Sequence, residues 1–344
     1  MITHPTTFVV GAGASFDFGF PLGEGLTKQI SNSLILNNTA RSDAAELMRT
    51  ALSILPRRSD VRIATVELYR QAPILRAGLG TASSIDAFLD SRHDDGAIEL
   101  LGKMAIGACL ITAERACSPL RPRRPGEPID ISASESSWIA RLFRTVLAPG
   151  VKKSHLERIF ENVSFIVFNY DRCIEHYLTH ALASHFTIDL DTAASVVRDR
   201  LNIVHPYGSL GPLHGVNDAI DFGHDYRSDT PHAADGIYAI SQRILTFTES
   251  QKANAAEAKA MVENALRLVF LGFGFGDQNM ELLRPRNTTI QDIRGTVKGL
   301  SRSNQREVAA QIHALTGQQV DGDDLVDCDC ASLISSEQMF LTRR

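Results

Sequence analysis

The sequence predicts an α/β protein with a doubly wound, Rossmann-like, mainly parallel sheet that is interrupted by a large, mostly helical insertion. Two features predict it: short apolar runs that each end in a glycine-rich or polar turn, and a long helical pattern between the first two runs. The runs cover residues 8–10, 165–168, 203–204 and 268–271. All-apolar runs of this length are typical of strands buried on both faces of a parallel sheet.

Helical patterns dominate the stretch between the first and second runs. Apolar residues recur at helical spacing over residues 47–55, 98–111 and 138–146, and serines that can cap a helix precede the last of these. We therefore expect a sheet domain over residues 1–39 and 156–344 and a helical insertion over residues 40–155. A further helix is expected over residues 304–315, ended by Gly317, with the remaining C-terminal residues completing an edge of the sheet.

Charge and hydrophobicity indicate a protein of the cytoplasm without membrane or nucleic-acid binding. The net charge is −5, so no general basic field recruits nucleic acid or anionic lipid. Arg121, Arg123 and Arg124 cluster in a proline-rich loop, which is either solvated or a contact for a polyanion or partner. No segment reaches the roughly 18 apolar residues of a membrane span, and the N-terminus lacks a signal-peptide pattern.

The cysteines point to a reducing compartment and away from a zinc site. The chain has five, at scattered positions, which argues against a disulfide scaffold. Cys328 and Cys330 have one residue between them and no second pair elsewhere, so we expect a terminal strand or turn there, and no zinc.

The turn after the first apolar run is the first candidate binding element. Gly11, Ala12, Gly13 and Ser15 carry nothing larger than a methyl or hydroxymethyl group, so backbone N–H groups can approach a diphosphate closely. A helix that follows would offer its positive end to the same anion. A glycine turn that only lets a strand pack under a helix has the same pattern.

The other three runs also end in polar or glycine-rich residues. In open α/β sheets, ligands bind beyond the carboxyl ends of the strands, where the strand order reverses. The four ends together therefore predict a nucleotide-binding crevice. The residues concerned are Asn169 and Asp171 after the second run, His205, Gly208 and Ser209 after the third, and Gly272, Gly274 and Asp277 after the fourth.

In this order the motifs resemble the sirtuin-like NAD-consuming domain of bacterial antiphage defence systems. The resemblance extends over roughly residues 7–290. The matching segments are residues 11–15 with Gly19 and Pro21, residues 84–89, residues 168–171 with Glu175, residues 205–211, and residues 271–277.

The resemblance implies a role for each candidate residue. Ala12, Gly13 and Ser15 would bind the NAD diphosphate, and Gly11 would shape the turn. Asn169 would hold the nicotinamide ribose, Asp171 would support that loop, and His205 would be the catalytic histidine. Gly208 and Ser209 would join the NAD-binding set, with Gly272, Gly274 and Asp277 near the adenosine half.

The implied activity is NAD+ hydrolysis to ADP-ribose and nicotinamide. Cleavage expels a neutral nicotinamide and leaves an oxocarbenium-like ribose, so the site must orient the ribose and position a water or a ribose hydroxyl. A histidine suits proton removal near neutral pH. An asparagine can orient a hydroxyl or water without adding charge.

Two departures from the sirtuin pattern limit the inference. Protein-deacetylating sirtuins carry a four-cysteine zinc module, which this chain lacks, so deacetylation is not expected. Their catalytic histidine directly precedes glycine, whereas Pro206 and Tyr207 separate His205 from Gly208. His214 does precede a glycine and remains the rival base.

The resemblance implies an effector that depletes NAD during infection. With no appended sensor in the sequence, activation would come from homo-oligomerisation or from a partner, such as a ring-forming ATPase, a short Argonaute-type protein or a phage component. The helical insertion is the expected assembly surface and lid. The alternatives are a regulatory module that binds NAD or ADP-ribose without turnover, a protein deacylase, or an ADP-ribosyl transferase.

Overall fold

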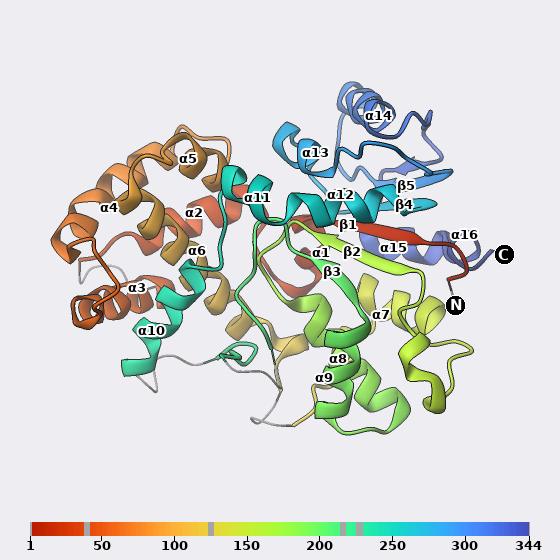
Figure 1. Cartoon of the computed structure of the whole chain (residues 1–344), viewed down its shortest axis with the longest axis horizontal. Helices are drawn as coiled ribbons and strands as arrows, with labels where there is room; N and C mark the ends of the chain where they lie inside the picture. The colour runs from red at the N-terminus through yellow and green to blue at the C-terminus, as the bar shows by residue number, and fades with distance from the viewer. Residues whose placement is uncertain (1, 38–41, 123–126, 214–217, 225–229, 344) are drawn as a thin grey trace. The chain divides into compact units, whose positions relative to one another are not determined.

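A computed structural model of the protein describes residues 2–37, 42–122, 127–213, 218–224 and 230–343 (Figure 1). Contacts divide the chain into two compact units, which are described separately below. Unit 1 comprises Met1–Phe18, Ser118–Pro206 and Gln251–Arg344, and unit 2 comprises Gly19–Cys117 and Tyr207–Ser250.

Unit 1 is built on a six-stranded parallel sheet in the order β3-β2-β1-β4-β5-β6. All four apolar runs form its strands. They are β1 (Thr6–Val10), β2 (Val163–Val167), β3 (Asn202–Val204) and β4 (Arg267–Leu271). The chain proceeds from β1 to β3 in one direction and from β4 to β6 in the other, so the strand order reverses between β1 and β4. The predicted doubly wound, Rossmann-like fold is confirmed.

Two further strands complete the sheet beyond β4. They are β5 (Asp292–Thr296) and β6 (Leu325–Val326). Neither shows an apolar run, because β5 carries an exposed aspartate at its start and β6 has only two residues. The expectation that the C-terminal region completes an edge of the sheet is confirmed, although the sequence did not locate these strands.

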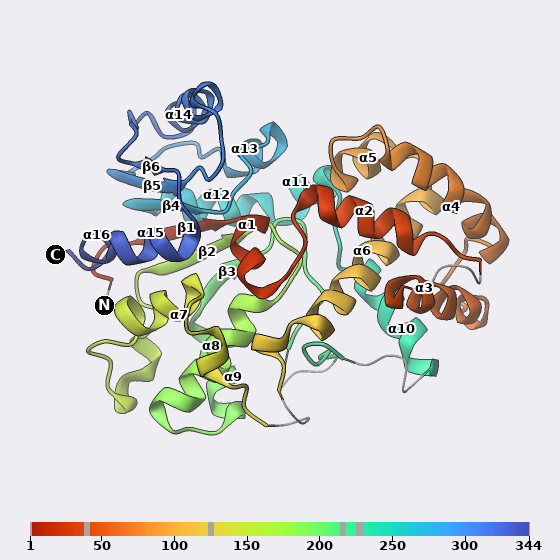
Figure 2. The same cartoon turned by 180° about the vertical axis from the view of Figure 1, so that it is seen from behind.

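Helices cover both faces of the sheet. The connection from β3 through β6 carries α12 (Ala255–Glu263), α13 (Asp277–Leu283) and α14 (Arg302–Thr316), and α12 lies in front of the strands in Figure 1. Figure 2 shows α15 (Cys330–Ser336) and α16 (Gln338–Thr342) in front of the opposite face. The β2–β3 connection holds α8 (Cys173–Phe186) and α9 (Leu190–Arg200). Gly317 ends α14 in the left-handed conformation, as the sequence predicted.

The third predicted helical pattern belongs to the sheet unit. It forms α7 (Trp138–Leu142), capped by the Ser137 hydroxyl, and a following π-helical turn, Phe143–Leu147. The Trp138 indole N–H donates to the Ala14 carbonyl at 2.8 Å, and its ring lies 6.5 Å from that of Phe165 in β2. These contacts explain why residues 118–155 group with the sheet and not with the insertion.

Unit 2 is helical, but its boundaries differ from the expected 40–155. The long helix α6 (Gly96–Ala116) contacts helices from both segments of the unit, so residues 19–39 and 207–250 belong to it as well. The remaining helices are α2 (Gly23–Ser33), α3 (Asp43–Ile54), α4 (Thr65–Leu79), α5 (Ile85–Ser91), α10 (Thr230–Ser241) and α11 (Phe247–Ala253), where the chain passes back to unit 1.

Helix α6 corrects one expectation from the sequence. We expected no segment apolar and long enough to cross a membrane, yet the 21 residues of α6 meet both conditions. Of the most apolar 18-residue stretch of α6, 78% is buried within the described part of the chain. A buried helix of this kind is compatible with a soluble protein.

The C-terminal helix α16 is held by two arginines of the sheet. The buried Arg267 guanidinium donates to the backbone carbonyls of Leu341 (3.4 Å) and Arg343 (3.3 Å) and lies 5.0 Å from the Phe340 ring centre. Arg294 lies over the same ring at 4.5 Å. The last residues of the chain therefore depend on β4 and β5.

We expect Arg267→Met to lower the free energy of unfolding by about 2 kcal/mol, because it removes charge-assisted hydrogen bonds at a buried site. Urea unfolding measures this value. The matched control is Arg302→Met, since Arg302 is exposed. Equal stability of the two variants would contradict the importance of this contact.

Candidate functional site

Two glycine turns touch where the strand order reverses. The Gly11 N–H donates to the Leu271 carbonyl at 3.0 Å, and the Gly13 N–H donates to the Gly272 carbonyl at 2.9 Å. A Cβ on Gly11 would lie 2.6 Å from the Gly272 oxygen, and one on Gly13 would lie 2.7 Å from the Gly272 Cα. Gly272 has φ +57°, and a Cβ there would lie 2.3 Å from the Ala14 nitrogen. Backbone contact therefore requires glycine at all three positions.

The helix after the first turn is short. Helix α1 (Ala12–Ser15) has four residues and continues as a 3-10 turn, Phe16–Phe18. The N–H groups of Gly13 and Ala14 donate within the fold, the latter to the Gly11 carbonyl at 3.0 Å. An anion at this turn would therefore gain fewer N–H donors and a weaker helix dipole than expected.

The end of β2 meets this turn through buried side chains. The Asn169 side-chain N–H₂ donates to the Gly11 carbonyl (3.0 Å) and to the Ser15 hydroxyl oxygen (2.8 Å). The Ser15 hydroxyl donates to Asp171 Oδ2 at 2.7 Å. Asp171 Oδ1 accepts the Cys173 N–H at 3.1 Å and so supports the start of α8. The structure thus brings Ser15, Asn169 and Asp171 together, as predicted.

His205 joins the same network from the end of β3. Its Nδ1 lies 2.8 Å from the Asn169 backbone oxygen, which can only accept, so Nδ1 carries a proton. Its Nε2 lies 2.9 Å from Glu175 Oε1, in the first turn of α8. Both ring nitrogens are therefore held by neighbours of the Asn169 loop, and 10% of the His205 side chain is exposed.

The His205–Glu175 pair shifts the pKa of both groups. Burial alone would lower the pKa of His205, but the Glu175 carboxylate and the hydrogen bonds to Glu175 and Asn169 raise it above its usual 6.5. Burial alone would raise the pKa of Glu175, but the charge of His205 and its hydrogen bond lower it below its usual 4.5. Asp171 also favours the charged form of His205. Both shifts favour the charged pair over the neutral one.

Sequence reasoning missed two residues that position His205. Glu175 appeared in the motif without a role, although its place four residues after Asp171, in the first turn of a helix, is a usable signal. Asn254, at the start of α12, donates to the backbone carbonyls of His205 (2.9 Å) and Pro206 (3.3 Å). It lies 49 residues from His205 along the chain, beyond unit 2, and no sequence pattern marks it.

Gly274 and Asp277 lie on the turn after β4 but outside the hydrogen-bonded network. Gly274 is exposed, and a Cβ there would meet nothing within 4 Å. Asp277 is exposed at the start of α13, and its Oδ1 accepts the Gln311 amide at 3.1 Å. Neither residue contacts the buried polar groups of the site.

Gly208 and Ser209 belong to unit 2 and are described only within it. Gly208 has φ +76°, and a Cβ there would lie 1.8 Å from the Arg243 carbonyl oxygen, so glycine is required for packing. The Ser209 hydroxyl oxygen accepts the Gly211 N–H at 3.3 Å. The rival base His214 lies outside the described residues.

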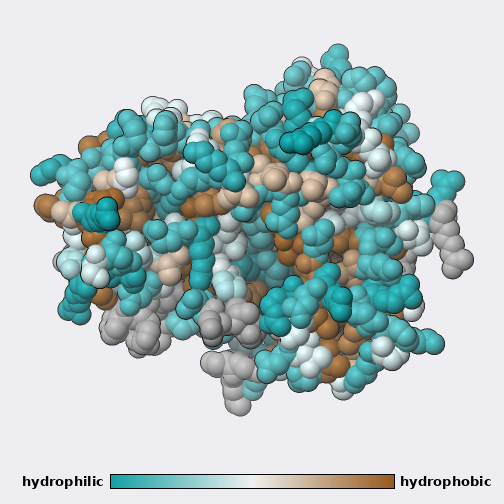
Figure 3. All heavy atoms as spheres, in the orientation of Figure 1, coloured by the Kyte–Doolittle hydropathy of each residue, from teal (hydrophilic) through white to brown (hydrophobic). Residues whose placement is uncertain are grey.

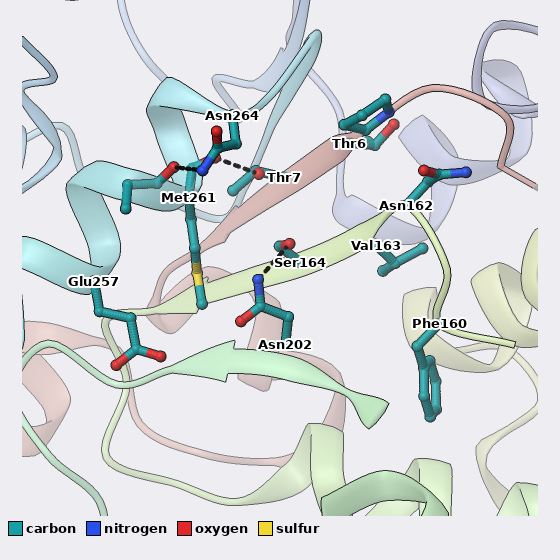
Figure 4. Close-up of a pocket in the computed structure, with 12 residues that line it drawn as sticks. Thr6, Thr7, Phe160, Asn162, Val163, Ser164, Asn202, Glu257, Met261 and Asn264 are labelled. Atoms are coloured by element: carbon teal, nitrogen blue, oxygen red, sulfur yellow. Dashed lines mark hydrogen bonds between the residues drawn. The ribbon is translucent and has the colours of Figure 1, made fainter. Parts of the chain in front are cut away.

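A pocket of about 330 Å³ lies at the other end of the strands (Figure 4). It is lined by Thr6, Val163 and Asn202, the first residues of β1, β2 and β3, whereas the network follows their last residues. The five residues of β1 separate the two places by about 16 Å. The Asn202 amide donates to Ser164 Oγ, and the Asn264 amide to the Ala260 carbonyl, so these pocket amides are bonded to neighbours.

The carboxyl-edge network (Ser15, Asn169, Asp171, Glu175 and His205) is therefore the candidate site of a Rossmann-like α/β protein. Among the described residues, no group of three or more histidines, cysteines, aspartates or glutamates could hold a metal ion. No protein-family model and no curated protein matches the chain.

The two glycines of the β4 turn give a matched test of this geometry. Gly272→Ala is expected to lower the free energy of unfolding by about 3 kcal/mol, through a left-handed alanine and a steric clash with the first turn. Gly274→Ala should leave stability unchanged, because its surroundings are open. Thermal and urea unfolding measure both values; similar losses in the two variants would contradict the described contact.

The charged pair predicts a specific pH dependence. His205 stabilises the folded state fully below pH 6.5, and this stabilisation is lost as the pH rises through its raised pKa. Glu175 stabilises the folded state fully above pH 4.5, and this stabilisation is lost as the pH falls through its lowered pKa. The difference in the free energy of unfolding between the wild type and Glu175→Gln is therefore expected to be largest between pH 4.5 and pH 6.5. NMR titration of the His205 ring should give a lower pKa in Glu175→Gln. An unchanged His205 pKa would show that the pair does not form.

Proposed function

We propose that the protein is an NAD+ glycohydrolase that cleaves the nicotinamide–ribose bond to give ADP-ribose and nicotinamide. The observation that carries the proposal is the carboxyl-edge network itself. It joins four of the residues to which the sirtuin-like resemblance gives a role, Ser15, Asn169, Asp171 and His205, and it adjoins the reversal of strand order, where such sheets bind dinucleotides.

The charges of the network suit this reaction. When the C–N bond breaks, its electron pair leaves with neutral nicotinamide, and positive charge develops on the ribose. The carboxylates of Asp171 and Glu175 lie around His205 and would stabilise this charge. A water then adds to the anomeric carbon, and its proton passes to the neutral form of the His205 imidazole. The diphosphate is proposed to lie along Ala12 and Gly13, which reach the surface beside the buried Ser15.

The hydrogen bonds of His205 define what catalysis requires and favour a second candidate function. Both ring nitrogens are bonded, and their partners favour the protonated ring, so the imidazole must first lose a proton and release Glu175 before it can act as a base. A site that stays closed would bind NAD or ADP-ribose without turnover, as a regulatory module. Nicotinamide release distinguishes the two functions.

The cellular role proposed from the resemblance is an NAD-depleting effector of antiphage defence in the cytoplasm. Its activity would be switched by homo-oligomerisation or by a partner, such as a ring-forming ATPase or a short Argonaute-type protein. Such control fits a network in which the catalytic histidine is held by two neighbours, because assembly could shift the balance between held and released states.

We expect His205→Ala and Asn169→Ala each to lower nicotinamide release by about 10²-fold or more, because one removes the base and the other the group that orients the ribose. Release is followed by chromatography over a range of protein concentrations, so that activation by self-assembly is included.

The matched controls are His93→Ala and Asn304→Ala, which change exposed residues outside the network and should keep wild-type activity. Folding of every variant is checked by circular dichroism. NAD+ binding without release by the wild type would favour the regulatory module, and folded His205→Ala protein with normal release would remove His205 from the mechanism.

A further inference from the structure

The pocket at the amino ends of β1, β2 and β3 contains a row of polar side chains. Thr7, Ser164 and Asn202 are neighbours across the three strands in the register of the sheet, so their side chains lie on one face. The Thr7 hydroxyl donates to the Met261 carbonyl of α12 at 3.0 Å, which shows that this is the face covered by α12. A small molecule in the pocket would therefore lie between the polar row and α12.

The polar side chains of the pocket direct donor groups to the protein. The lining residues whose N–H or O–H groups donate to protein oxygens are Thr6, Thr7, Asn162, Asn202 and Asn264. An amide that donates through its nitrogen still has an oxygen that can only accept. In Figure 4 the Asn202 oxygen is turned toward the side of the pocket from which Glu257 extends. The pocket is therefore suited to a ligand that donates hydrogen bonds.

Glu257 gives the pocket its charge. It is the one charged residue among the described residues that line the pocket, and it is exposed on α12. Met261 lies four residues later, on the same side of the helix, and its buried side chain extends toward the strands in Figure 4. Figure 3 shows hydrophobic and hydrophilic residues side by side on the face that carries α12. A carboxylate beside a thioether complements a cationic group on a short apolar stem.

We propose that this pocket binds the primary ammonium group of a small organic amine. An ammonium group has three N–H donors and no acceptor, which matches the Glu257 carboxylate and the Asn202 oxygen. The apolar stem lies along Met261. The volume of about 330 Å³ holds roughly ten non-hydrogen atoms, so the amine is small. Because the carboxylate is exposed, we expect a dissociation constant on the order of 1 mM.

The ammonium pocket is independent of the carboxyl-edge network. Both lie in unit 1, but they adjoin opposite ends of the strands. A carboxylate also disfavours the diphosphate of NAD+ at this end of the sheet. Failure of amine binding would therefore leave the proposed NAD+ cleavage untouched.

Titration of the full chain with butylammonium chloride at pH 7 tests the charge of the ligand. A primary amine is charged at this pH, since its pKa is about 10.4. The side-chain amide NMR signals of Asn202 and Asn264 should shift and saturate, whereas 1-butanol, which is uncharged and of the same size, should shift neither signal. Equal shifts with 1-butanol, or no saturable shift with butylammonium, would overturn the proposal. Tighter binding of Nα-acetyl-lysine methylamide would support the site and assign the ammonium group to a peptide lysine.

Removal of the carboxylate tests the role of Glu257. We expect Glu257→Gln to weaken butylammonium binding by about fivefold, because the charge is lost while the shape is kept. Glu307→Gln is the matched control, since it removes the same charge from an exposed position on α14 and should leave binding unchanged. Equal weakening in both variants would show only a general attraction of cations to a negatively charged protein, and would overturn the site.

A gain of affinity tests the position of the ammonium group. Asn202→Asp places a second carboxylate beside the proposed ammonium group and should strengthen butylammonium binding by about fivefold, as measured at the Asn264 signal. A partly unfolded variant would lose affinity and not gain it, so this result cannot arise from damage to the fold. Unchanged or weaker binding by folded Asn202→Asp protein would contradict the proposed position.

Discussion

The contact between two backbone turns, one after β1 and one after β4, constrains the rest of the sheet unit. The Gly13 N–H donates to the Gly272 carbonyl at 2.9 Å, and the two turns lie so close that a Cβ on Gly11, Gly13 or Gly272 would clash with the facing backbone. Because the turns touch, the short helix α1 directs Ser15 toward the end of β2, where Asn169 and Asp171 bind its hydroxyl. The polar network at the carboxyl edge thus depends on the absence of three Cβ atoms.

The same constraint changes how the glycine turn can act. From sequence, a Gly-x-Gly turn is equally suited to hold a phosphate or to let two segments touch, and here Gly13 uses its N–H for the second purpose. Recognition of a ligand then falls mainly on side chains: the Asn169 amide, the carboxylates and the His205 imidazole. This shifts the chemistry of the site from anion binding toward the ribose, where positive charge would develop.

The fold could be predicted from the sequence where a strand is buried on both faces and therefore consists of apolar residues. Such runs marked the strands β1 to β4. β5 has none, because Asp292 is exposed and Arg294 forms ion pairs with Asp324 and Glu337. Asn169, Asp171 and His205 could be predicted because they directly follow the apolar runs that form β2 and β3. Asn254 could not be predicted, because only the folded chain brings the start of α12 to the carbonyl of His205.

Hydrogen–deuterium exchange with and without NAD+ tests the central claim most directly, because it locates the ligand without requiring turnover. The account predicts slower amide exchange in residues 11–16, 169–172 and 272–276 when NAD+ is added, with no change at the opposite edge of the sheet. Protection confined to residues 160–164 and 202, which line the pocket of Figure 4 at the opposite end of the strands, or no protection at all, would contradict it.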